Sequence, residues 1–545
     1  MCLAAGTFTE NLTITKNLSL RGAARDQTIL QGAVRVELDR PIQVALTNLT
    51  VTGSRFGAGV RIGGQAIVTL DDAAVTESFM GVLAVGSARA TITNAQISHN
   101  QYDGVRGEGS ALLTAQNTRI VENGLDGVVV RDSAELKLGE SIIENNKRCG
   151  LRVFAGKVSG TPNAMRGNGA DLCGFAPATL RTPLVAQTDK TQITVPTDFQ
   201  NLQEALDAVA PGGTVLLQNG TYETGLTIWK PVTLRGPATL KALPNRQLVL
   251  SVTAEAQSVI IEEITISQSR GDGLLLYGQT TLRNAQILDH ADDGVEIAGA
   301  AVVQFVKSSI SGNGDDGLFL SEKAQLILTD STVSGNGGDG IEARDSTAVK
   351  LQNSQISHNK LRGLDVRIAA QLELSNSRIV GNKSDGLVLR DSAQAQLDAA
   401  QILSNGANGF VATDKAQATL TNSAISGNGS NGMEASGAAT VEIRRSALEN
   451  NGTAETCARA DTLCTGLVMI GTAQVRLGDS AVRANADWGI MAWLRRCGAP
   501  FDFFTGQVAF EGTNTIANNN KSSNHKGNPG THPFANLPDG QVCLP

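Results

Sequence analysis

The sequence predicts an all-β protein made of two tandem right-handed parallel β-helices, with three strands in each coil of about 23 residues. Two observations predict the coil: one glycine recurs at a fixed interval, and an asparagine stands four residues before most of these glycines. A third observation predicts two helices, because an N-terminal segment returns later in the chain. A fixed period of this length is typical of solenoids, in which each repeat packs only on its neighbours.

The recurring glycine, called here the marker glycine, sets the length of the coil. It stands at Gly294, Gly317, Gly340, Gly363, Gly386, Gly409 and Gly432, and earlier at Gly81, Gly104, Gly127 and Gly150. The next interval, from Gly432 to Gly466, is longer, because it holds one coil plus an insertion that contains Cys457. We expect the marker glycine to provide either a positive φ or a close approach of two backbones at a turn.

Each coil contains three short runs of alternating apolar residues, which predicts three strands rather than a helix. The residue sixteen places after the marker glycine is always aliphatic, as at Ile356, Ile379 and Ile402. Coils that stack about 4.8 Å apart align such residues in columns. We therefore expect an aliphatic core beside a ladder of asparagine amides that donate to one another. The ladder residues are Asn100, Asn123, Asn146, Asn313, Asn336, Asn359, Asn382, Asn405 and Asn428.

A duplication divides the chain into two domains. Residues 215–236 repeat residues 1–22, and the coil repeat is lost over residues 176–192, so we predict domains at 1–185 and 186–545. An amphipathic helix near residues 198–210, with Asp198 as its N-cap, is expected to cover the open end of the second coil stack. The first copy starts too late to include such a helix, so we expect its cap, and any signal peptide, to lie upstream of Met1.

Composition and charge exclude two classes of partner. The net charge is −7 and the chain has no basic run, so nothing in it is typical of nucleic-acid binding. No apolar stretch approaches the roughly 18–20 residues that span a bilayer, so we expect no membrane span.

Seven cysteines bear on the compartment. Proximity in the sequence predicts Cys149–Cys173, Cys457–Cys464 and Cys497–Cys543 as disulfides and leaves Cys2 unpaired. Free thiols are the alternative, whereas zinc fits the spacing poorly. Disulfides would place the protein outside the cell or on its surface.

The predicted helix, the segment PGGTVLLQNGTYETGLTIWKPVTLRG and the SGNGxDG turns resemble the pectate-lyase-like right-handed parallel β-helix superfamily, particularly its carbohydrate-binding, NosD-like branch. The resemblance covers nearly the whole chain and implies the fold and a polysaccharide partner. It does not imply one activity, because that superfamily holds lyases, hydrolases, epimerases, esterases and proteins without catalysis. The chain lacks the Asp-Pro-His-Asp motif of the mannuronan epimerases and the Gly-His-Gly and Arg-Ile-Lys motifs of the polygalacturonases, and it shows no clear match to the arginine motif of the pectate lyases.

Acidic residues gather beside the marker glycines. Stacked carboxylates about 4.8 Å apart repel one another unless they are solvated, protonated or bridged by a cation. They are therefore either solvated turn residues or a calcium site. The densest group consists of Asp293, Asp315, Asp316 and Asp339.

Acids and arginines alternate two and four residues after the marker glycine. This face could bind an acidic sugar through arginine, and an acid beside a uronate could assist elimination or epimerisation. The alternative is a ladder of salt bridges that keeps the sheet soluble. The predicted substrate-binding residues are Glu296, Glu342, Arg344, Asp365, Arg367 and Arg390, and the catalytic candidates are Glu342, Arg344, Asp365, Arg367 and His290.

His290 occupies an asparagine position of the ladder, with acidic residues nearby. It is either a general base or metal ligand, or a substitute within the ladder.

These observations favour an exported β-helix that binds polysaccharide or serves as a rigid surface rod without catalysis. A lyase or epimerase acting on an acidic polysaccharide is the first alternative. A self-associating filament or adhesion module is the second, because the chain is a duplication.

Overall fold

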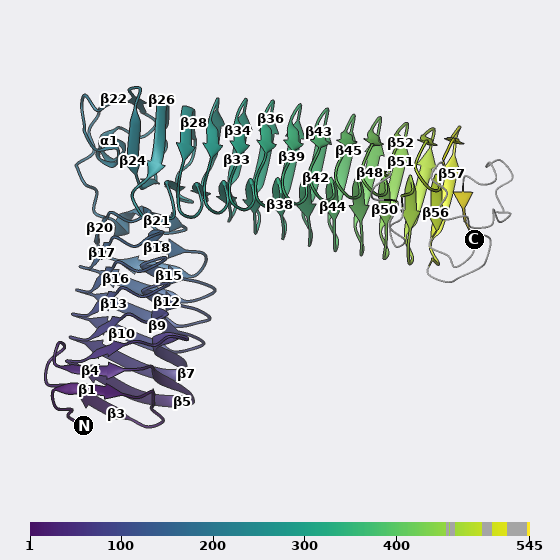
Figure 1. The fold of residues 1–545 in the computed structure, drawn as a ribbon. Coiled ribbons are helices and arrows are strands. Elements are labelled where there is room, and N and C mark those ends of the chain that lie inside the picture. The colour runs from purple at the N-terminus through teal and green to yellow at the C-terminus, as the bar shows by residue number, and fades with distance from the viewer. Residues whose placement is uncertain (454–456, 458–463, 493–503, 520–541, 545) are drawn as a thin grey trace. The chain divides into compact units, whose positions relative to one another are not determined.

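The computed structural model describes residues 1–453, 457, 464–492, 504–519 and 542–544. It is an all-β solenoid (Figure 1) that divides into two compact units, Met1–Thr280 and Thr281–Pro545. The predicted boundary after residue 185 lies inside the first unit, and the division into two tandem helices stays a prediction. Within the described residues no helix is long and apolar enough to cross a membrane.

One coil of the second unit illustrates the repeat. It consists of β35 (Leu318–Leu320), β36 (Gln325–Thr329) and β37 (Thr332–Ser334). These strands pair in parallel with β38 (Ile341–Ala343), β39 (Ala348–Gln352) and β40 (Gln355–Ser357) of the next coil. Because Leu318 lies opposite Ile341, the pairing register equals the period of the marker glycines. The prediction of three strands in each coil is confirmed.

One sheet of the second unit is formed by the first strand of each coil. In the second unit its described strands run in the order β32, β35, β38, β41, β44, β47, β50, β53, β56 and β59 (Val542–Cys543). The bounds of those not yet given are Val295–Ile297 for β32, Leu364–Val366 for β41, Leu387–Leu389 for β44, Phe410–Ala412 for β47, Met433–Ala435 for β50, Leu467–Met469 for β53 and Ile490–Ala492 for β56.

The other strands of the second unit form the opposite wall. They include β42 (Gln371–Ser375), β43 (Arg378–Val380), β45 (Gln394–Asp398), β46 (Gln401–Leu403), β48 (Gln417–Thr421), β49 (Ala424–Ser426), β51 (Thr440–Arg444) and β52 (Ala447–Glu449). Side chains alternate between the two faces of a strand, so every second residue enters the interior. The predicted column of Ile356, Ile379 and Ile402 is at most 1% exposed.

The marker glycine is required by a close approach rather than by a positive φ. A Cβ atom built on Gly340 would lie 2.7 Å from the backbone oxygen of Gly363 and 2.7 Å from Nδ2 of Asn359. Gly340 itself does not have a positive φ. A side chain at this place would therefore collide with the next coil, which explains why glycine returns at every turn.

The asparagine ladder is confirmed in both units. Nδ2 of Asn313 donates to Oδ1 of Asn336 at 2.9 Å, and Asn336 donates in the same way to Asn359. In the first unit Asn100 donates to Asn123 at 2.9 Å. Each amide satisfies the next one, so buried polar side chains recur here without the cost of unpaired groups.

The first unit contains helix α1 (Leu202–Ala208), whose apolar residues are buried as predicted. The predicted N-cap was wrong: Asn201, not Asp198, accepts the backbone N–H groups of Gln203 and Glu204. Asp198 instead accepts the backbone N–H of Thr194 at 2.7 Å. That bond fixes Asp198 in the preceding turn, so the helix begins later than its sequence pattern indicates. That α1 covers the open end of the second coil stack stays a prediction.

Strands of the first unit that carry outward side chains used below are β9 (Met80–Ala84), β12 (Val105–Gly107), β15 (Val128–Val130), β18 (Cys149–Val153) and β21 (Ala170–Gly174), which pair in this order. Near the end of this row, Arg181 is buried between Asp171 and Asp207, with N···O distances of 2.7 and 2.9 Å. Both ion pairs of Arg181 are thus formed within the first unit.

Two of the three predicted disulfides are present. Cys149 is bonded to Cys173, and Cys457 to Cys464. Cys543 is disulfide-bonded as well, but its predicted partner Cys497 lies outside the described residues. Cys2 is a free, exposed thiol.

Candidate functional site

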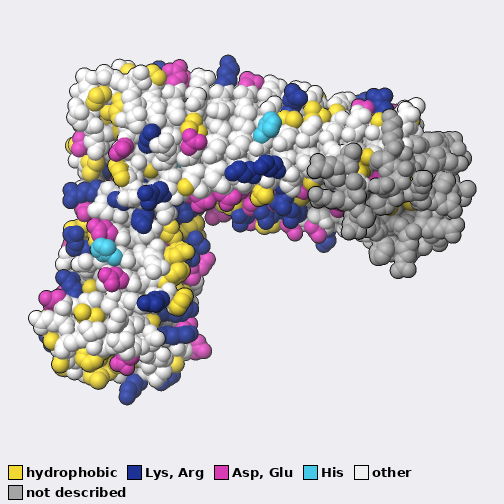
Figure 2. Space-filling view, viewed as in Figure 1, with side chains coloured by type: hydrophobic (Ala, Val, Ile, Leu, Met, Phe, Trp, Pro, Cys, Tyr) yellow, Lys and Arg dark blue, Asp and Glu magenta, His cyan; other side chains and the backbone are white. Residues whose placement is uncertain are grey.

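The candidate site lies on the outer side of β38, β41 and β44. The middle residues of β38 and β41, Glu342 and Asp365, face each other in the pairing register. An arginine follows each strand closely: Arg344, Arg367 and Arg390. We call these five residues, together with Arg362, the arginine face. Figure 2 shows basic and acidic side chains gathered along the side of the second unit where Figure 1 labels β38 and β44.

Ion pairs connect the arginine face across strands. Nη2 of Arg367 lies 2.7 Å from Oε1 of Glu342 and 3.4 Å from Oδ2 of Asp365, so this arginine joins two coils. Arg344 lies 2.9 Å from the same oxygen of Glu342. Two like charges opposite each other in a sheet are unfavourable, and the shared arginine offsets that repulsion.

Asp365 is the buried centre of the arginine face. Its side chain is 1% exposed, and three arginines lie within 3.4 Å of its oxygens: Arg362, Arg367 and Arg390. The arginines themselves remain between 28% and 38% exposed. A buried carboxylate therefore holds a row of guanidinium groups that solvent can still reach.

The arginine face is not a set of closed bidentate pairs. Among the described residues, Oε1 of Glu342, Oδ1 of Asp365 and the Nε atoms of all four arginines are buried without a hydrogen-bond partner. These atoms lie near opposite charges without hydrogen-bond geometry. Buried polar atoms are usually satisfied, so this region has unused capacity for hydrogen bonds.

Aromatic packing supports one end of the face. The guanidinium of Arg344 lies 4.3 Å from the ring centroid of Phe319, which stands opposite Glu342 on β35. Arginine binds an aromatic face through its flat side and keeps its N–H edge available for oxygen acceptors.

The aspartates before the marker glycines accept backbone N–H groups of the next coil. Oδ1 of Asp293 accepts the backbone N–H of Asp316 at 3.0 Å, and Oδ1 of Asp316 accepts that of Asp339 at 2.6 Å. Asp339 in turn accepts the backbone N–H of Arg362 at 2.7 Å. These aspartates form a second ladder, which links successive coils through one oxygen of each carboxylate.

Burial raises the pKa of two aspartates in this ladder, Asp316 and Asp339. Burial is the largest cause that raises the pKa of Asp316 to about 7, and the charges of Asp339, Asp315 and Glu342 act in the same direction. The backbone N–H of Asp339 lowers it. Burial also raises the pKa of Asp339. A carboxyl group that titrates near neutral pH thus lies beside the arginine face.

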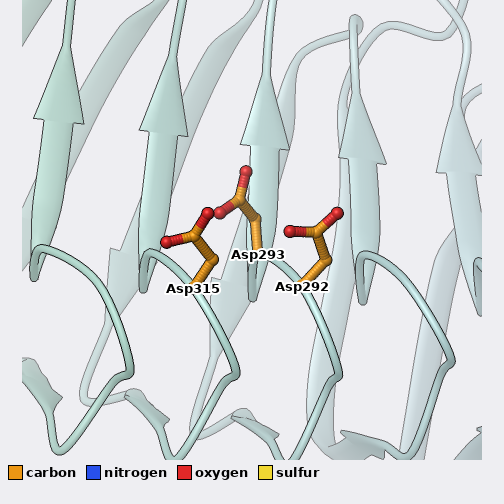
Figure 3. Close-up of side chains that lie close together, drawn as sticks. All are labelled: Asp292, Asp293 and Asp315. Atoms are coloured by element: carbon orange, nitrogen blue, oxygen red, sulfur yellow. The ribbon is translucent and has the colours of Figure 1, made fainter.

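A group of acids stands at the turn before β32 and β35. One carboxylate oxygen of each of Asp292, Asp293 and Asp315 lies within 4.8 Å of the others (Figure 3). The structure thus brings together two of the four predicted calcium residues and adds Asp292. Carboxylate oxygens are the ligands that calcium prefers. Calcium binding at this turn stays a prediction.

Two other predicted residues lie apart from the arginine face. Glu296 is on β32, and Phe319 stands between it and Glu342 in the same row. His290 is buried at the ladder position, and its backbone N–H donates to Oδ1 of Asn313 at 3.3 Å. This geometry fits a ladder substitute.

Arg362 and Phe319 were not predicted from the sequence to belong to the site. Arg362 stands immediately before Gly363, where neighbouring coils carry aspartate, so this exchange of sign was a signal available in the sequence. Phe319 occupies the row of Glu342 and Asp365. It was passed over because it is not charged.

A family model for the right-handed β-helix region matches residues 36–176, 250–402 and 385–530. The chain belongs to this family. The resemblance drawn from the sequence is confirmed for the fold. No curated protein sequence matches the chain significantly.

Solved β-helix structures are similar at low identity. The A-module of mannuronan C-5 epimerase AlgE4 from Azotobacter vinelandii has a TM-score of 0.41 at 13% identity and covers 56% of this chain and 91% of that one. Pectate lyase Pel9A has a TM-score of 0.28 at 13% identity, and the match covers 58% of this chain and 72% of that one. The catalytic unit of an α-1,3-glucanase from Streptomyces thermodiastaticus has a TM-score of 0.37 at 14% identity, and the match covers 62% of this chain and 70% of that one. Similarity at this level carries no argument about function.

Proposed function

We propose that the chain is an exported protein that binds an acidic polysaccharide along the arginine face without catalysis. The observation that carries this proposal is the row of Arg344, Arg367 and Arg390, held in register by the buried carboxylate of Asp365 and by Glu342. Four arginines meet the carboxylates of Asp339, Glu342 and Asp365, which leaves one positive charge in excess.

The spacing of the arginines suits a polymer. Successive coils stack about 4.8 Å apart. A carboxylated sugar is of similar length, so a polymer lying along the solenoid could present one carboxylate to each arginine. Arginine recognises a carboxylate through paired N–H donors, and a fixed guanidinium loses less conformational entropy on binding. A salt-bridge ladder that served solubility alone would not need to bury Asp365.

The cysteines support export. The bonds Cys149–Cys173 and Cys457–Cys464 are of the kind that persists outside reducing compartments. We therefore infer an extracellular or cell-surface location, where polysaccharides are available.

Affinity electrophoresis in gels containing polygalacturonate tests the proposal. We expect the protein to be retarded at low salt and released as salt rises, because exposed charges are screened. The double variant Arg344→Gln, Arg367→Gln should be retarded clearly less than the wild-type protein. The control variant Lys350→Gln, Arg378→Gln removes the same charge from exposed residues of other strands and should bind normally. If both double variants lost the same amount of retardation, net charge alone would explain the binding. If the wild-type protein were not retarded at all, the chain would be better described as a structural rod.

A lyase or epimerase is the second candidate, because Asp316 has a pKa of about 7 and lies near Glu342. A group that titrates near the working pH is suited to proton transfer. This candidate predicts unsaturated, ultraviolet-absorbing ends or a changed sugar configuration after incubation with a uronate polymer. If the wild-type protein formed either product and Asp316→Asn did not, the chain would be an enzyme and the non-catalytic proposal would be wrong.

A further inference from the structure

The first unit carries its own arginines on the corresponding face. Arg106 and Arg152 stand two residues after the marker glycines Gly104 and Gly150, and Arg131 stands four residues after Gly127. Two and four residues after the marker glycine are the positions that the arginine face uses. β12, β15 and β18 pair in register, with Arg106 and Arg152 opposite Val129 on either side. The repeat therefore places all three arginines together.

An aromatic ring orients two of them. The guanidinium carbons of Arg131 and Arg152 lie 4.0 and 4.2 Å from the ring centroid of Phe154. Stacking on an aromatic ring uses the flat side of a guanidinium group, so the N–H edge of Arg131 can still reach an acceptor. Phe154 thus has the role toward these arginines that Phe319 has toward Arg344.

Positive charge is concentrated at Arg131. Arg106 is paired with Glu108 at 2.5 Å and with Asp103 at 3.4 Å. Arg131 forms no ion pair with the residues that the structure describes, and its Nε is buried without a hydrogen-bond partner. Burial lowers the pKa of Arg131, and the charges of Arg106 and Arg152 lower it further, against Glu108 and Asp103. A bound anion would relieve this crowding of like charges.

We propose that Arg131, together with Arg106 and Phe154, forms a second binding site for a carboxylated sugar unit, located on the first unit. The ligand class follows from the donor set: oriented guanidinium edges fit a planar carboxylate with two oxygens. This inference rests on the proposed function of the arginine face, but the two sites are separate. Each chain then has two binding sites for short acidic oligosaccharides.

Titration calorimetry with hexagalacturonate measures the number of sites on the full chain. The wild-type protein should bind two hexasaccharides, Arg131→Gln should retain the site on the second unit, and Arg367→Gln should retain the site on the first. The double variant should bind none. Arg119→Gln removes an exposed arginine from β14 (Arg119–Val121) and should leave two sites. Melting curves confirm that each variant is folded.

A second variant keeps the charge. Phe154→Leu removes only the aromatic support, and we expect roughly fivefold weaker binding at the first-unit site, because such stacking contributes about 1 kcal/mol. One site in the wild type, lost in Arg367→Gln and kept in Arg131→Gln, would overturn this inference and preserve the proposed function. One site lost only in Arg131→Gln would do the reverse. Equal binding of an uncharged hexasaccharide would overturn both.

Discussion

Nη2 of Arg367 lies 2.7 Å from Oε1 of Glu342, a residue of the preceding coil. The pair connects two turns of the solenoid through side chains rather than through the backbone ladder. It also keeps the guanidinium at the surface, where a ligand carboxylate can reach it. Structure and proposed binding therefore depend on the same charges, and variants must separate the two effects.

Removing the charge of Asp365 should destabilise the second unit. Asp365→Asn leaves its three arginines facing a neutral side chain, and we expect a loss of about 2 kcal/mol in the free energy of unfolding, because the group is buried but its partners are partly exposed. Denaturant unfolding measures this. Glu373→Gln, which breaks the exposed pair with Lys350, is the control and should cost less than about 1 kcal/mol. Equal costs would contradict the central role of Asp365.

A charge in the aliphatic column should prevent stable folding. Ile379 is fully buried and pairs with Ile356 and Ile402 in adjacent coils. Ile379→Asp places an unpaired carboxylate there, at a cost of about 4 kcal/mol or more. Arg378→Asp introduces the same carboxylate one position earlier on the exposed face and should change the melting temperature little. An unchanged melting temperature for Ile379→Asp would refute the column.

The raised pKa of Asp316 makes stability depend on pH. In the folded chain Asp316 binds its proton up to about pH 7, whereas its reference pKa is 3.8. The folded state therefore holds more protons between these values, so this group's contribution to the free energy of unfolding falls as pH rises from about 4 to 7. Asp316→Asn should remove that part of the decline while keeping an oxygen acceptor for the N–H of Asp339. Melting temperatures of both proteins from pH 4 to 8 give the comparison, and parallel curves would contradict it.

Calcium should stabilise the chain if the acids at the turn before β32 and β35 bind it. A ligand that binds only the folded state stabilises it by RT ln(1 + [L]/Kd), so the melting temperature rises with the logarithm of the ligand concentration once this exceeds the Kd. We expect millimolar calcium to raise the melting temperature and Asp315→Asn to abolish the rise. Magnesium, which accepts this geometry less readily, is the control ion. No response to calcium would identify these residues as solvated turn aspartates.

The contacts that the sequence did not predict all lie between neighbouring rows of side chains. The rows of acids and arginines were predicted, but the entry of Arg362 into the arginine face and the separation of Glu296 by Phe319 were not. The predicted calcium site likewise included Asp316 and Asp339, although one carboxylate oxygen of each accepts a backbone N–H. In each case the decisive contact lies between neighbouring rows, and the period within one row contains no information about it.

By itself the sequence determined the β-helix coil, the buried aliphatic columns, the asparagine ladder and the bonds Cys149–Cys173 and Cys457–Cys464. It could do so because stacking repeats one translation, so a constant period dictates which side chains lie above one another. Only the tertiary structure decided that Asp365 is buried among three arginines and that Arg131 lies against Phe154 without an ion pair among the described residues. Burial and charge pairing depend on side-chain directions across rows, which packing in three dimensions sets.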